Sequence, residues 1–174
     1  RYTTKLIDKF FVAGELTIQL GDKYQAKCWF AEAKQLCKSA LTILKVIGRR
    51  REEAVVYTRL GSLCWKLSEY QKAKEYHEKA LAIVIGIGDR IGEGRTYGCL
   101  GNLFEHLGEY QNAKEYNERA IAIAIEIGDR IGEGTTYGNL GNVFQSLGEY
   151  QKAKEYIEKA IAIAIEIGDR NEIG

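Results

Sequence analysis

Apolar positions along this chain follow a helical period in blocks that glycine residues separate. Within residues 89–128, the first block begins after Asp89, a residue type that caps helix N-termini, and stops at Gly108. The second block begins near Tyr110 and stops at Gly128. This pattern predicts two consecutive helices that are joined by a short turn.

The segment IAIAIEI at residues 121–127 has a period of two, which by itself would favour a strand. Alanine, however, is the best helix former and a poor strand former. The segment also continues a helical run through Tyr116 and Ala120. Isoleucine on two sides of a helix indicates burial on two sides. We therefore expect a helix here, packed on its partner helix and on a neighbouring unit.

The two-helix unit recurs along the chain at an interval of 40 residues. The string EYQNAKEYNERAIAIAIEIGDR at 109–130 has close copies at 69–90 and 149–170, and residues 90–129 differ from 130–169 at only eight positions. A diverged copy covers the stretch before residue 50. We expect a single array over residues 1–174, with units at 10–49, 50–89, 90–129 and 130–169 and partial units at 1–9 and 170–174.

The unit resembles the tetratricopeptide repeat (TPR), whose pattern is an aromatic residue, Leu-Gly, a second aromatic residue, Gly-x-Tyr and two alanines seven apart. In the third unit these are Tyr97, Leu100-Gly101, Phe104, Gly108-Glu109-Tyr110, Ala113 and Ala120. The 40-residue length and the string GDRIGEG resemble the Pins/LGN-type adaptors. The resemblance implies an all-α fold, a right-handed superhelical solenoid of antiparallel helix pairs with about four repeats.

The resemblance also implies that the first helix of each unit lines a concave groove. The groove positions that it assigns are Arg59, Ser62, Trp65 and Lys66 in the second unit, Arg95, Cys99, Asn102, Glu105 and His106 in the third, and Asn139, Asn142 and Gln145 in the fourth. Four of the eight differences between the third and fourth units fall at these positions, namely 95, 99, 105 and 106. Such variation indicates a binding surface, although drift at solvent-exposed positions remains the alternative.

The chemistry of these positions favours a peptide ligand. Arginine recognises carboxylates with two parallel hydrogen bonds, and the amides of Asn102 and Asn142 can hold a peptide backbone. We therefore expect an extended or helical peptide with acidic residues. Pins/LGN-type arrays are similar in carrying a groove arginine, matched here by Arg95. Thr135 and Val55 stand at the equivalent positions of the fourth and second units, so the charge clamp is incomplete.

Composition excludes several other classes of protein. The 25 basic and 24 acidic residues leave a net charge of +1, which argues against a nucleic-acid binder or a basic membrane-surface protein. No apolar run approaches the roughly 18 residues that a membrane span needs. Four cysteines without regular spacing indicate reduced thiols, no metal site and a cytoplasmic location. Because the sequence contains no methionine, we expect a fragment of a longer protein.

No catalytic or cofactor-binding motif is present in the sequence. The string GIGDRIGEG at residues 86–94 lacks the spacing of a nucleotide loop, and the segment before it is predicted to be helical. His77 and His106 are 29 residues apart without metal-ligand spacing, and we interpret the first as structural and the second as a groove contact. We therefore expect neither an enzyme nor a bound cofactor.

These observations predict a protein-binding scaffold or adaptor whose partner is a protein or peptide segment. Two alternatives stay open at this point. The array could be the sensor or regulatory part of a larger signalling or enzymatic protein, or it could self-associate through apolar surface at the ends of the array.

Overall fold

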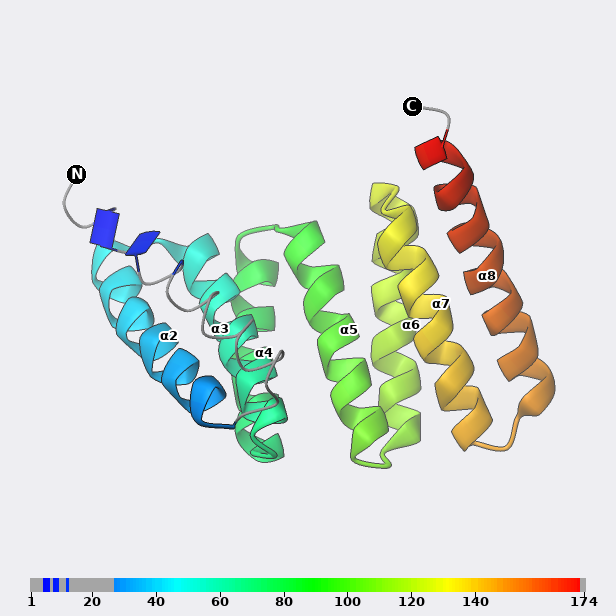
Figure 1. Cartoon of the computed structure of the whole chain (residues 1–174), viewed down its shortest axis with the longest axis horizontal. Helices are drawn as coiled ribbons and strands as arrows, with labels where there is room; N and C mark the ends of the chain where they lie inside the picture. Colours follow the sequence, from blue (N-terminus) through cyan, green and yellow to red (C-terminus); the bar gives the residue numbers. More distant parts are fainter. Residues whose placement is uncertain (1–4, 7, 10–11, 13–26, 173–174) are drawn as a thin grey trace. The chain divides into compact units, whose positions relative to one another are not determined.

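Over the residues that the computed structural model describes, namely 5–6, 8–9, 12 and 27–172, with side chains up to residue 168, the chain is all-α. The helices with defined bounds are α2 (Lys27–Ile47), α3 (Arg50–Lys66), α4 (Tyr70–Gly86), α5 (Arg90–His106), α6 (Tyr110–Ile127), α7 (Arg130–Ser146) and α8 (Tyr150–Glu172) (Figure 1). The segment at residues 121–127 lies within α6, which confirms the expected helix. The first helix of the unit at 10–49 lies outside the described residues.

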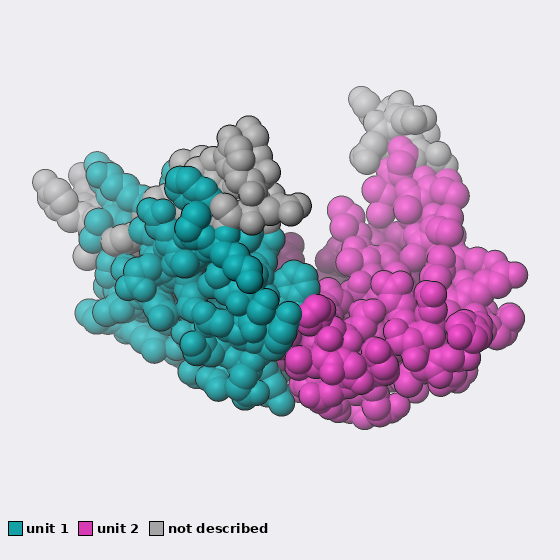
Figure 2. Space-filling model, turned by 60° about the horizontal axis from the view of Figure 1, so that its bottom comes forward, with its two compact units in different colours: residues 1–89 teal, residues 90–174 magenta. Residues whose placement is uncertain are grey.

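The chain forms two compact units, residues 1–89 and 90–174 (Figure 2). In the first unit, α3 packs on both α2 and α4. In the second unit, α5 pairs with α6 and α7 pairs with α8, and α7 also packs on both α5 and α6. Within each unit the helices therefore form the repeated antiparallel pairs that the sequence predicts, while the handedness of a superhelix over the whole chain stays a prediction.

The turn inside each pair is built by a left-handed residue after the first helix. Gly108 has φ +76°, its N–H donates to the carbonyl of Glu105 at 3.0 Å, and the N–H of Glu109 donates to the carbonyl of Phe104 at 2.9 Å. These two bonds form a Schellman motif, which glycine favours because it has no Cβ. Ser68 occupies the same place after α3 with φ 63°, where a side chain is strained.

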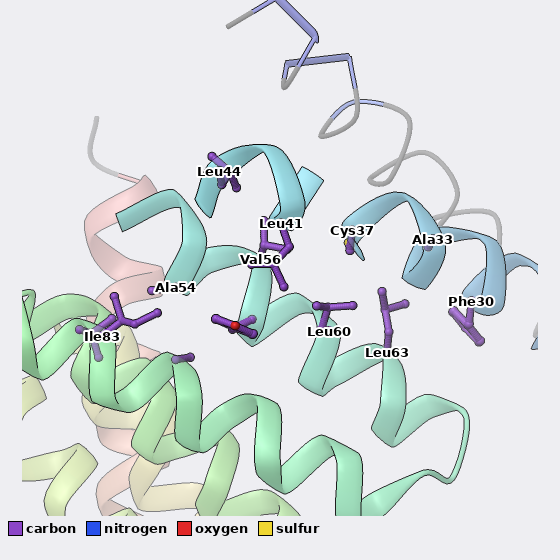
Figure 3. Close-up of a cluster of buried hydrophobic side chains, with 13 residues drawn as sticks. Phe30, Ala33, Cys37, Leu41, Leu44, Ala54, Val56, Leu60, Leu63 and Ile83 are labelled. Carbon is purple, nitrogen blue, oxygen red and sulfur yellow. The ribbon is translucent and has the colours of Figure 1, made fainter. Parts of the chain in front are cut away.

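Leucine and alanine side chains fill the core of the first unit. Figure 3 shows Leu60 and Leu63 of α3 among side chains of α2 such as Ala33 and Cys37. Leu60 and Ala33 have no exposed surface. Alanine at such positions lets two helices approach closely, so α2, α3 and α4 share one continuous core.

The glycines at 61, 101 and 141, inside the first helix of the second, third and fourth repeats, make room for the helix that follows. A Cβ on Gly101 would lie 2.5 Å from the amide of Asn117 on α6, and one on Gly61 would lie 2.5 Å from the ring of His77 on α4. This confirms that glycine here lets the second helix approach. His77 is 3% exposed, which supports its interpretation as a structural residue. Burial lowers the pKa of His77 to about 4.

An arginine at the start of α5 and of α7 links the two helices of its pair. Arg90 pairs with Glu93 one turn along α5 at 2.6 Å and with Glu126 at the far end of α6. Arg130 repeats the arrangement with Glu133 and with the carboxylate at the same place on α8. These ion pairs are partly exposed, so they contribute little to the stability of the fold. They mainly hold the two helices together at the end opposite their turn.

Candidate functional site

The candidate positions of the third repeat, residues 90–129, lie along one face of α5. Residues 95, 98, 99, 102, 105 and 106 follow the spacing of three and four that brings side chains to the same side of a helix. Arg95, Asn102 and His106 are exposed, and Cys99 and Glu105 are half-buried. The opposite face of α5 holds the buried residues of the core, including Leu100 and Phe104. The helix therefore has one packed face and one accessible polar face.

The candidates of the fourth unit occupy the same positions on α7. Asn142 and Gln145 are exposed and Asn139 is half-buried. The helices α5 and α7 pack on each other and derive from nearly identical repeats. Their polar faces therefore lie on the same side of the compact unit of residues 90–174. We call these eight residues the α5–α7 surface: Arg95, Cys99, Asn102, Glu105, His106, Asn139, Asn142 and Gln145.

The α5–α7 surface carries two charges of opposite sign. Arg95 is exposed, and it makes no ion pair within the part of the chain that the structure describes. Glu105 is ten residues further along α5, about 15 Å at 1.5 Å per residue. Burial raises the pKa of Glu105, and His106 beside it acts in the opposite direction. The surface can therefore offer a cation at one end of α5 and a partly desolvated carboxylate at the other.

The candidates of the second repeat, residues 50–89, lie on α3, in the compact unit of residues 1–89. Arg59, Ser62 and Lys66 are half-buried, and Trp65 is 43% exposed. The Ser62 hydroxyl donates to the carbonyl of Thr58 at 3.2 Å. The Lys66 ammonium lies 5.0 Å from the centre of the Phe30 ring on α2. This lysine therefore has an intramolecular contact, and a groove that joins both units stays a prediction.

The sequence did not identify the lining of an apolar hollow on α7 and α8. This open hollow of about 590 Å³ is lined by Ile131, Gly134, Thr135, Ile157, Ala160, Ile161, Ile163, Ala164 and Ile167. We call it the end surface. The sequence predicted apolar surface at the ends of the array, but it did not indicate which residues form it.

Two further features are absent from the described part of the chain. No group of histidine, cysteine and carboxylate side chains there could hold a metal ion. No described helix is both long enough and apolar enough to cross a membrane.

Comparison with known sequences identifies the family. The sequence model of the tetratricopeptide repeat matches residues 14–85 and 93–166. The chain belongs to the tetratricopeptide repeat family, whose arrays of helix pairs typically mediate protein–protein interactions. The match is to the family as a whole, so membership of the Pins/LGN-type subclass stays a prediction. No curated protein gives a significant match to the chain.

Solved structures share the fold. BtubC from P. vanneervenii is 22% identical with a TM-score of 0.77, over 91% of this chain and 64% of that one. Aspartyl phosphate phosphatase F from Bacillus subtilis is 20% identical with a TM-score of 0.81, over 94% and 42%. A STAND protein with a tetratricopeptide repeat sensor from Pyrococcus horikoshii is 24% identical with a TM-score of 0.74, over 94% and 25%. The chain thus spans less than two thirds of the length of each of these proteins.

Proposed function

We propose that the α5–α7 surface binds a peptide segment of another protein, and that the array acts as a scaffold through this binding without catalysing a reaction. Its accessible polar residues are spaced along two neighbouring helices, which suits an extended chain. The four free cysteines support a cytoplasmic location for this function.

One observation carries this proposal, and it combines the repeat comparison with accessibility. On α5, four positions are exposed, and two of them, Arg95 and His106, differ between the third and fourth repeats; the half-buried Cys99 and Glu105 on the same face differ as well. On α6, eight positions are exposed, and only Asn112 and Arg119 among them differ. Drift at exposed positions would affect both helices alike. The concentration on α5 therefore favours selection for different contacts.

The residues of the surface suggest how a peptide is held. The Arg95 guanidinium suits a carboxylate of the ligand, in a charge-assisted pair that is stronger than a neutral hydrogen bond. The amides of Asn102 and Asn142 each offer donors and an acceptor to a peptide backbone. Glu105, partly removed from water, is stabilised by any donor that the ligand places beside it. The ligand of this proposal is an acidic peptide with at least one donor group.

The proposal can be tested by selecting peptides from a displayed library on this protein and measuring their affinity. The selected peptides should be rich in Asp and Glu. Arg95→Thr, which installs the residue of the fourth repeat, should weaken binding at least about tenfold because a charge-assisted pair contributes about 1.5–3 kcal/mol. Arg119→Lys also installs the residue of the fourth repeat, but on the exposed face of α6, and should leave affinity unchanged.

Two results would reject the proposal at different levels. Equal affinity in Arg95→Thr and the parent protein would remove the acidic-peptide interpretation. Unchanged affinity in a double Asn102→Ala, Asn142→Ala variant would show that peptides bind elsewhere. Because all three positions are exposed, each variant is expected to fold, and helix content measured by circular dichroism checks this.

A regulatory role within a longer protein is a second candidate. The Pyrococcus horikoshii relative is described as a signal-transduction ATPase with a repeat array as its sensor, and this chain matches 25% of it. Such an array would bind its ligand on the same surface and pass the signal to another domain. Peptide binding that changes the activity of an attached domain in the full-length protein would favour this role over a passive scaffold.

A further inference from the structure

The arginine that begins the first helix of a repeat has two carboxylate partners in the third and fourth repeats, but only one in the second. In the third repeat, Arg90 donates to Glu93 on its own helix at 2.6 Å and to Glu126 on α6 at 3.1 Å. The fourth repeat has the same arrangement. The counterpart in the second repeat, Arg50, pairs with Glu53 at 2.7 Å and has no second carboxylate within the part of the chain that the structure describes. One edge of its guanidinium therefore holds no carboxylate.

The second partner is missing because the chain has a glycine where the later repeats have a glutamate. Gly86 on α4 stands at the place of Glu126 on α6 and of Glu166 on α8. Helices α3 and α4 form an antiparallel pair, so the start of α3 lies beside the end of α4 (Figure 1). A Cβ on Gly86 would meet no group of a neighbouring helix within 4 Å. The Arg50 side chain is 56% exposed, against 41% for Arg90, so an external group can reach it.

Other substitutions around this arginine also favour a negatively charged ligand. Arg49 stands where the later repeats have an aspartate, and Arg51 where they have an isoleucine. Glu52, at the place of a glycine, is the one change in the opposite direction. The first exchange adds two positive charges, the second and the lost glutamate add one each, and Glu52 removes one, so the region is more positive than its counterparts by three charges. We call these residues the basic corner: Arg49, Arg50, Arg51, Glu52, Glu53 and Gly86.

The counterpart in the third repeat shows which group fits the open edge. There the Nε and Nη2 atoms of Arg90 both donate to the Glu126 carboxylate, and these hydrogen bonds lower the pKa of Glu126. Such a fork matches the two oxygens of a carboxylate. Arg90 holds two carboxylates although its surroundings are the more negative ones, so Arg50 can hold a second one as well. Arg49 and Arg51 each pair with a carboxylate of the chain, but both side chains are more than half exposed and steer an acidic ligand toward the site.

We propose that the basic corner binds a glutamate or aspartate side chain from an acidic segment of another protein. The carboxylate accepts hydrogen bonds from Arg50 and takes the place that Glu126 holds in the third repeat. Gly86 leaves room for the backbone of the ligand to approach α4. Glu53, which is 3% exposed, keeps the other edge of the guanidinium occupied, so the site takes one carboxylate. This site lies on α3 and α4 and does not depend on the peptide binding proposed for the α5–α7 surface.

The test is an NMR titration of the whole protein with a short peptide of glutamate and alanine residues. The side-chain N–H signals of Arg50 and the amide signals of Ile85 and Ile87 should shift and saturate. A matched peptide of glutamine and alanine should cause no shift. Gly86→Glu installs the residue of the later repeats, whose carboxylate should occupy Arg50 and weaken binding at least about tenfold.

Two control variants separate the position of the charge from its presence. Gly86→Gln supplies a side chain of the same shape without the charge, and Gln71→Glu adds the same charge at the other end of α4. Both should leave affinity nearly unchanged. Gly86 and Gln71 are exposed, so all three variants are expected to fold, and helix content measured by circular dichroism checks this.

The outcomes separate the proposal from its alternatives. Weaker binding in Gly86→Glu alone supports it. Absence of a saturable shift at Arg50, or equal loss in Gly86→Glu and Gln71→Glu, overturns it. Tighter binding of a single-stranded oligonucleotide to the same residues overturns it in favour of a phosphate ligand. Sedimentation that shows a dimer of the parent protein and a monomer of Gly86→Glu overturns it in favour of self-association. Arg95→Thr should leave the shifts at Arg50 unchanged, so failure of this site is distinguishable from failure of the α5–α7 surface.

Discussion

A buried histidine makes the stability of the first unit depend on pH. His77 on α4 lies against Gly61 of α3, is 3% exposed, and has an Nδ1 atom without a hydrogen-bond partner. Burial lowers its pKa from 6.5 to about 4, because a charged ring would lose its hydration. The third and fourth repeats carry Asn117 and Ile157 at the same place, so the protein itself supplies two substitutions that fit this site.

The sign and size of the effect follow from the two pKa values. Below pH 6.5 the unfolded chain binds a proton on residue 77 that the folded chain excludes until about pH 4. Stability is therefore fully present above pH 6.5 and falls as the pH is lowered through this window. Each pKa unit corresponds to about 1.4 kcal/mol, so the free energy of unfolding should fall by about 2 kcal/mol at pH 5 and about 3 kcal/mol below pH 4.

The measurement is denaturant unfolding of the parent protein and of His77→Asn, followed by circular dichroism at pH 7.5 and pH 5. Other groups titrate in the same range, so the relevant quantity is the difference between the two proteins. The parent should lose about 2 kcal/mol more than His77→Asn on acidification. His77→Ile, which has no titrating group either, should behave like His77→Asn. An identical pH dependence in all three proteins would refute the buried neutral ring.

Further substitutions test the turn, the helix packing and the charge of Glu105. Ser68→Gly should stabilise the first unit by about 1 kcal/mol, because glycine adopts φ 63° without strain, and a thermal melt would detect a higher midpoint. Gly101→Ala should destabilise by roughly 1–3 kcal/mol through its contact with Asn117, whereas Gly98→Ala, with nothing within 4 Å of its Cβ, should be neutral or stabilising in the same melts. Glu105→Gln should raise the melting midpoint more at pH 7 than at pH 4, because burial raises the pKa of Glu105 and so disfavours its charged form.

The helix pairs could be predicted from the sequence because local signals agree at every boundary. The helices α5 and α7 begin at Arg90 and Arg130, directly after an aspartate, and the Asp129 side chain accepts a hydrogen bond from the N–H of Gly132 at 2.9 Å. The glycine that was expected to stop the first helix adopts the left-handed conformation. These are properties of a few consecutive residues, so no tertiary information was needed.

Contacts made by long side chains could not be predicted in the same way. The ammonium of Lys66, a predicted groove residue, lies 5.0 Å from the centre of the Phe30 ring on a neighbouring helix, a contact that the sequence did not predict. A lysine side chain has four rotatable bonds, and its partner is set by the distance between two helices rather than by spacing along one. The end surface escaped prediction for a related reason, since seven of its nine residues are identical to residues of the preceding repeat, where α7 packs on α5 and α6.

Variation between repeats identifies a binding surface only when burial is considered with it. The residue opposite the Leu-Gly glycine is His77, Asn117 or Ile157 in successive repeats, and the first two are buried. This position changes freely because the absent Cβ of glycine leaves room for side chains of different shape, so its variation reports packing. Positions 95, 99, 105 and 106 change on the polar face of α5, where Arg95 and His106 are exposed and Cys99 and Glu105 are half-buried. Core packing does not require the changes at Arg95 and His106, so these two positions are where the proposed peptide contacts and drift predict different effects of exchanging residues between the repeats.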